Sequence, residues 1–100
     1  MNIVAVTACP TGIAHTYMAA EQLEKTARKL GHSIKVETQG AMGVENELSA
    51  ADISAADAAI FAVDIAVERE ERFHNIRIVK VPVQSVLKDP ERVFHQLAQP

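Results

Sequence analysis

The chain is short of cysteine, aromatic side chains and long apolar runs, and each shortage excludes a class of protein. It has one cysteine, no tryptophan, one tyrosine and three phenylalanines. A single cysteine cannot form an internal disulfide, and nothing near it has the spacing of a metal site, so we expect no metal, no cofactor and a reducing, cytoplasmic location. The longest later apolar run, 58–63, is far shorter than the roughly 20 residues that cross a bilayer, which predicts no insertion into a membrane.

A concentrated positive charge is also missing. The formal net charge is −3, and the lysines and arginines are scattered along the chain. A nucleic-acid backbone would need a basic stripe, and its bases would need aromatic platforms, so nucleic acid is excluded as a partner. With 100 residues, the length suits one compact domain over 1–100.

What is present is a regular alternation of short apolar runs and helical patterns. It predicts an α/β fold, a small doubly wound, Rossmann-like sheet of four parallel strands in the order 2-1-3-4, flanked by helices. The second strand is expected to be a half-exposed edge. We predict strands at 2–7, 33–38, 58–63 and 77–81, and helical segments at 13–30, 49–55, 67–73 and 83–97.

Turn and cap residues mark several of the expected boundaries. Gly31 is expected to end the first helix, and Ser49 with Asp52 has the capping-box pattern of a helix start. Asp89 followed by Pro90 is the usual pairing of an N-cap with a first helical residue. Residues 39–47 are expected to form a long loop, and 67–73 a charged helix facing solvent.

Cys9 is the candidate nucleophile, because it lies where the first strand gives way to a Gly-containing turn and a helix. Backbone N–H groups in such a turn and the positive end of the helix dipole lower a thiol pKa and hold a phosphate beside the sulfur. No lysine or arginine precedes Lys25, so backbone dipoles and hydroxyls would have to meet the negative charge. The predicted phosphate-binding residues are Pro10, Thr11, Gly12, Ile13, Ala14, His15 and Thr16.

Gln39 and Gly40 follow the second strand, so they are expected to border the Cys9 site at the carboxyl edge of the sheet. Tyr17, Met18 and Met42 are expected to pack in or near the core, with docking beside the site as the alternative.

Three roles for an active cysteine compete. A redox role would need Cys-x-x-Cys or a resolving partner, and the chain has neither. A low-molecular-weight tyrosine phosphatase has an arginine that clamps phosphate where this chain has His15, and its acid would have to be Asp89, which is better explained as a helix cap. A phosphate carrier needs an in-line nucleophile and electrostatic support, with little acid or base catalysis.

The residues around Cys9 resemble a known family. The stretch 4–21, VAVTACPTGIAHTYMAAE, together with 35–40, KVETQG, is similar to the enzyme IIB component of the fructose-type, phosphoenolpyruvate-dependent sugar phosphotransferase system. The resemblance implies that Cys9 is a phosphocysteine, which takes phosphate from a histidine of a IIA protein and passes it to a sugar held by the membrane-embedded IIC permease. It also implies transient contacts with both partners, at the inner face of the membrane, by a protein that is otherwise a monomer. A phosphatase and a non-catalytic docking module remain the alternatives.

Overall fold

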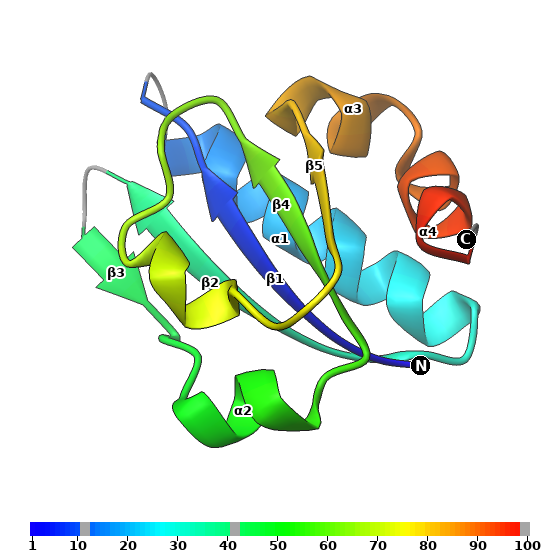
Figure 1. The fold of residues 1–100 in the computed structure, drawn as a ribbon. Coiled ribbons are helices and arrows are strands. Elements are labelled where there is room, and N and C mark those ends of the chain that lie inside the picture. Colours follow the sequence, from blue (N-terminus) through cyan, green and yellow to red (C-terminus); the bar gives the residue numbers. More distant parts are fainter. Residues whose placement is uncertain (11–12, 41–42, 99–100) are drawn as a thin grey trace.

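The fold is a five-stranded sheet with helices on both faces (Figure 1). The computed structural model describes residues 1–10, 13–40 and 43–98. The strand order is β3-β2-β1-β4-β5, with β3 antiparallel to β2 and every other neighbouring pair parallel. In chain order the elements are β1 (Asn2–Ala8), α1 (Ile13–Lys29), β2 (Ser33–Gly40), β3 (Gly43–Glu45), α2 (Ala50–Ala55), β4 (Ala58–Val63), the 3-10 helix η1 (Glu70–Phe73), β5 (Ile78–Val81), α3 (Val83–Lys88) and α4 (Pro90–Ala98).

The central strands β1 and β4 are apolar on both faces, as strands covered by helices on two sides must be. In β1, Ile3 and Ala5 point to one face, whereas Val4 and Val6 point to the other. All six residues of β4 are buried. This burial fixes the register, because a slip by one residue would exchange the two faces.

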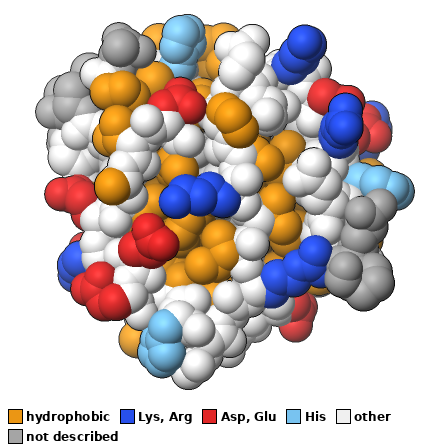
Figure 2. All heavy atoms as spheres, turned by 45° about the horizontal axis from the view of Figure 1, so that its top comes forward, with side chains coloured by type: hydrophobic (Ala, Val, Ile, Leu, Met, Phe, Trp, Pro, Cys, Tyr) orange, Lys and Arg blue, Asp and Glu red, His pale blue; other side chains and the backbone are white. Residues whose placement is uncertain are grey.

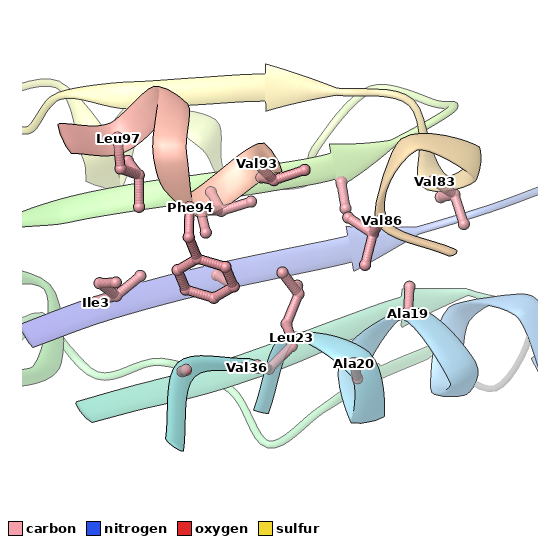
Figure 3. Packing of buried hydrophobic residues seen from close by; sticks show 14 of the residues in the cluster. Ile3, Ala19, Ala20, Leu23, Val36, Val83, Val86, Val93, Phe94 and Leu97 are labelled. Atoms are coloured by element: carbon pink, nitrogen blue, oxygen red, sulfur yellow. The ribbon is translucent and has the colours of Figure 1, made fainter. Parts of the chain in front are cut away.

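One face of the sheet is covered by α1, α3 and α4. Figure 3 shows Leu23 of α1, Val86 of α3 and Phe94 of α4 directed into one apolar layer over β1. All three are at most 3% exposed. Burying a side chain of this size stabilises the fold by about 1.5–3 kcal/mol, so this layer secures the three helices. We call it the α1 face.

The other face is covered by α2, η1 and the segments that flank them. Ile53 of α2 and Phe73 of η1 pack with β1 and β4, and the ring of Phe73 meets Phe61 of β4 edge to face at 4.9 Å between centroids. Such aromatic pairs add about 0.5–1.5 kcal/mol to the burial of their area. We call this layer the η1 face.

The four predicted parallel strands are confirmed in their predicted order, as β2-β1-β4-β5. The expected loop 39–47 is wrong in part, because β2 continues to Gly40 and 43–45 form the additional strand β3. The half-exposed edge is also wrong for the end of β2, since Val36, Glu37, Thr38 and Gln39 are all buried. A period-two pattern shows which residues of a strand are polar. It does not show whether a polar side chain has a buried hydrogen-bond partner and is therefore buried itself.

The helical prediction for 67–73 is wrong except at its end, where η1 covers only Glu70–Phe73. Val67 and Phe73 are buried in the η1 face, so this segment is not a solvated helix. Arg69, at φ 55°, breaks the helical path immediately before η1. The closing segment 83–97 forms two helices, α3 and α4, with Asp89 between them.

The predicted helix ends are confirmed. Gly31 follows α1 with φ 81°, and the amides of Gly31 and His32 donate to the carbonyls of Arg28 and Ala27, which is the Schellman arrangement. Ser49 and Asp52 form both hydrogen bonds of the capping box of α2. In the described part of the chain, no helix combines the length and the apolar character needed to span a bilayer.

Candidate functional site

Cys9 lies directly after β1, at the carboxyl edge of the parallel strands. Its side chain belongs to the α1 face and is only 5% exposed. The preceding residue, Ala8, is held in the sheet, with its carbonyl accepting a hydrogen bond from the Asp64 amide at 2.9 Å. The thiol is therefore attached to a fixed backbone. Because it is nearly buried, a partner has to contact the surrounding surface closely to reach the sulfur.

The first turn of α1 follows Cys9 after a short connection. Ala14 and His15 are exposed in this turn, whereas Thr16 is buried. The Thr7 hydroxyl donates to the Thr16 carbonyl at 3.1 Å and so ties the start of α1 to β1. A helix start carries N–H groups without intrahelical partners, which suit an anion.

The remaining predicted phosphate-binding residues are placed only in part. Pro10 is exposed. Thr11 and Gly12 lie outside the described residues, and of Ile13 only the backbone is described. Phosphate binding by 10–16 stays a prediction.

Gln39 and Gly40 reach the same edge of the sheet. Gln39 pairs with Ala8 in the register of β2 with β1. A Cβ added at Gly40 would lie 3.8 Å from the Thr16 Oγ1, so the end of β2 approaches α1 on the same face as Cys9. The Gln39 side chain instead points to the η1 face, with the side chain of Glu37, because the two residues alternate with those of the α1 face.

A buried polar cluster lies under the η1 face. The Glu37 carboxylate is inaccessible to solvent and pairs with Arg72 through two hydrogen bonds of 3.0 Å, one to each oxygen. The Leu48 amide donates to the same carboxylate at 2.8 Å, and the Gln39 amide group donates at 2.6 Å. The Gln39 side chain also holds the Glu68 backbone, accepting from its N–H at 2.8 Å and donating to its carbonyl at 3.3 Å.

Burial by itself raises the pKa of Glu37, but hydrogen bonds from Arg72, Gln39 and the Leu48 amide, with the charge of Arg72, outweigh it and hold the pKa below its ordinary value of 4.5. Glu37 is therefore ionised at neutral pH. The sequence did not single out Glu37 or Arg72, because 35 residues separate them and Arg72 lies in a charge run typical of a solvated helix. In a strand that the sequence predicts to be a half-exposed edge, a glutamate gives no signal of burial.

Exposed apolar side chains occur close to the Cys9 edge. Tyr17 is 40% exposed and Met18 is 51% exposed, so the expectation that they pack in or near the core is wrong, and docking beside the site stays a prediction. Met42 lies outside the described residues. Tyr17 donates a hydrogen bond to the Glu45 carboxylate, which raises the pKa of Tyr17 and ties α1 to β3. Ile65 is exposed just after β4, and Figure 2 shows hydrophobic side chains open to solvent between single charges.

Asp89 lies away from this edge. Its carboxylate accepts from the Arg92 amide at 3.3 Å, as the predicted N-cap of α4 should. It lines one hollow with His32, which precedes β2 and therefore lies near the amino ends of the strands. Asp64, by contrast, is at the carboxyl edge and accepts from the Val83 amide at 3.3 Å, at the start of α3.

Comparison with known proteins points to one family. A family model described as "PTS system, Lactose/Cellobiose specific IIB subunit" matches residues 4–96. The chain belongs to the IIB family of sugar phosphotransferase systems. IIB components of these systems are phosphotransferases, and the names of its relatives point to the fructose-like systems.

Among curated relatives of this IIB chain, the PTS system fructose-like EIIB component 2 of Escherichia coli K12 is 48% identical over 96 residues, which are 96% of this chain and 91% of that protein. The 2-O-alpha-mannosyl-D-glycerate-specific EIIABC component of the same organism is 51% identical over 95% of this chain, which matches 14% of that longer protein. A crystal structure titled as a predicted fructose-specific IIB from Escherichia coli superposes with a TM-score of 0.92, at 44% identity, over 98% of this chain and 90% of that chain.

Proposed function

We propose that this IIB chain is a phosphoryl carrier whose acceptor is the Cys9 sulfur. The donor is the phosphohistidine of a IIA protein or domain, and the final acceptor is a fructose-like sugar bound by a membrane-embedded IIC permease. The observation that carries this proposal is the position of Cys9, on a fixed strand end that leads into the start of α1. In this position, backbone dipoles stabilise negative charge at the sulfur.

The first step forms one bond and breaks one. The Cys9 thiolate attacks the phosphorus of the donor, the S–P bond forms, and the P–N bond to the histidine breaks with its electron pair staying on the imidazole. In the second step a sugar hydroxyl oxygen attacks the same phosphorus, the O–P bond forms, the S–P bond breaks and the thiolate returns. The hydroxyl proton leaves to a base on the acceptor side. Positioning is the main demand on the carrier.

The relatives support both partners, because this chain matches one part of proteins named EIIABC and EIIBC. The proposal therefore locates the domain in the cytoplasm, with brief contact to IIC at the inner face of the membrane. In this proposal the IIC permease, and not this chain, selects the sugar. The names of the relatives include fructose and mannosylglycerate, and the name of the family model includes lactose and cellobiose.

Phosphorus NMR tests the proposal. Mixing the protein with a phosphorylated IIA donor is expected to replace the phosphohistidine signal by a thiophosphate signal, and Cys9→Ser is expected to abolish that signal while the fold is kept. A thiophosphate signal that persists in Cys9→Ser would contradict the assignment. Hydrolysis of phenyl phosphate that depends on Cys9 would favour a phosphatase instead, although the cap role of Asp89 argues against an acid at that position.

A further inference from the structure

The segment after β4 crosses the end of β1. At its start the Asp64 amide bonds to Ala8, the residue before Cys9, and at its end the Glu68 backbone bonds to Gln39 on β2. Since β1 lies between β4 and β2, residues 64–68 pass across the carboxyl end of β1 beside Cys9. Figure 1 shows this path from β4 to η1.

The Gln39 side chain holds the segment through the same pair of hydrogen bonds that a neighbouring strand would form. Its side-chain oxygen accepts from the Glu68 N–H at 2.8 Å, and its nitrogen donates to the Glu68 carbonyl at 3.3 Å. One amide group thus satisfies both backbone groups of one residue, as a paired strand residue would. Gln39 is 2% exposed, so water does not compete for these bonds.

Arg72 completes the attachment with every N–H of its guanidinium. Two donate to Glu37, and the others donate to backbone carbonyls, at 2.9 Å to Arg69, 3.3 Å to Glu68 and 3.4 Å to Leu48. A lysine has neither the number nor the planar arrangement of donors to do this. The segment is therefore fixed at its far end by an ion pair between a buried carboxylate and a partly buried guanidinium, rather than by apolar packing alone.

We propose that Glu37, Gln39 and Arg72 form a brace that holds residues 64–69 as a fixed contact surface for the phosphorylated IIA donor. The segment starts next to Cys9, because the Asp64 amide bonds to Ala8, so a donor that reaches the sulfur at this edge meets residues 64–65, where Ile65 offers an exposed apolar side chain. Gln39 and Arg72 are positioning residues, since they touch neither the sulfur nor the transferred group in this arrangement. The proposal rests on the phosphoryl-carrier function.

The test uses four variants. Gln39→Met and Arg72→Met remove the bonds of the brace at similar side-chain length. Glu37→Gln with Arg72→Met also removes the buried carboxylate, so it relieves the unpaired charge while the bonds from Arg72 to the segment stay absent and those from Gln39 to Glu68 remain. Arg77→Met is the matched control, because Arg77 also holds backbone carbonyls, those of Gln96 and Leu97, but at the end of α4.

Amide hydrogen exchange needs no donor and tests the brace itself. Exchange of the Glu68 amide and its neighbours is expected to rise about tenfold or more in Gln39→Met, Arg72→Met and the double variant. It is expected to stay unchanged in Arg77→Met. Unchanged protection of 64–69 in both single brace variants would overturn the brace, whatever the outcome with the donor.

Kinetics of Cys9 phosphorylation test the positioning role. The KM for phosphorylated IIA is expected to rise about tenfold in the three brace variants, while kcat stays within about twofold. The double variant separates positioning from stability, because its stability should recover while its KM stays raised. An unchanged KM, or a fall in kcat alone, would overturn the role. If the donor fails to phosphorylate the unaltered protein, the carrier function and the positioning role fail together, and the brace is judged by exchange.

Discussion

Apolar packing covers the α1 face of the sheet, whereas over β2 the η1 face is covered by segments held through the buried Glu37 carboxylate, its partner Arg72 and their hydrogen bonds. On the first face regular helices deliver Leu23, Val86 and Phe94 to one layer. On the second face, irregular segments are attached to Glu37 and Gln39 through their backbone groups. The difference teaches that a segment without a repeating apolar pattern is fixed here by polar side chains on a strand.

Breaking the polar attachment should have the largest effect on stability. Arg72→Met leaves Glu37 charged and buried without its partner, so we expect the free energy of unfolding to fall by about 3–5 kcal/mol. Adding Glu37→Gln should recover a large part of the loss. Urea unfolding of the two variants measures both values. A loss below about 1 kcal/mol in Arg72→Met, the size typical of a surface pair, would contradict the account.

The α1 face should respond to volume alone. Leu23 is fully buried among α1, α3 and α4. Leu23→Ala is expected to cost about 2–5 kcal/mol, as cavities in packed cores do. The cost should be the same at pH 4 and pH 7, since no charge is involved. Urea unfolding at both values measures it, and a strong dependence on pH would mean that the two faces are not independent.

Acid should weaken the η1 face first. The pKa of Glu37 is below 4.5 in the folded protein, so its contribution is complete above that value and is lost as pH falls through the lowered pKa. The bond from Lys35 and those from Ser49 lower the pKa of Asp52 to about 2, which extends the loss to lower pH. We expect stability to fall from about pH 4.5 downward. Thermal unfolding against pH measures this, and an equal slope in Glu37→Gln would disprove the role of Glu37.

The smallest effect expected is a gain. Among the described residues, the buried Thr38 Oγ1 finds no hydrogen-bond partner, in contrast to the neighbouring Glu37 on the other face. Thr38→Val keeps the shape and removes the unsatisfied hydroxyl, so it should raise the free energy of unfolding by about 1 kcal/mol. Thermal unfolding shows the sign. Destabilisation of that size would mean that the hydroxyl has a partner in solution.

The sequence predicts the α1 face better than the η1 face. Helical spacing, Gly31, and Asp89 with Pro90 mark α1 and α4 because these signals are local. The position of Cys9 after β1 is equally local. The contacts of the brace are not local, since 35 residues separate Glu37 from Arg72. In the sequence, neither residue differs from an exposed charged residue. β3 escaped prediction because Gly43, Val44 and Glu45 are too few to show a period of two.

The central claim is that Cys9 carries the phosphoryl group, and intact mass tests it most directly. The protein is incubated with a phosphorylated IIA donor and weighed before and after iodine, which attacks phosphate-bearing sulfur. The account predicts one added phosphoryl group, lost with iodine and absent in Cys9→Ser. No added mass, from a donor shown to phosphorylate another IIB, would contradict it and favour a docking module without transfer activity.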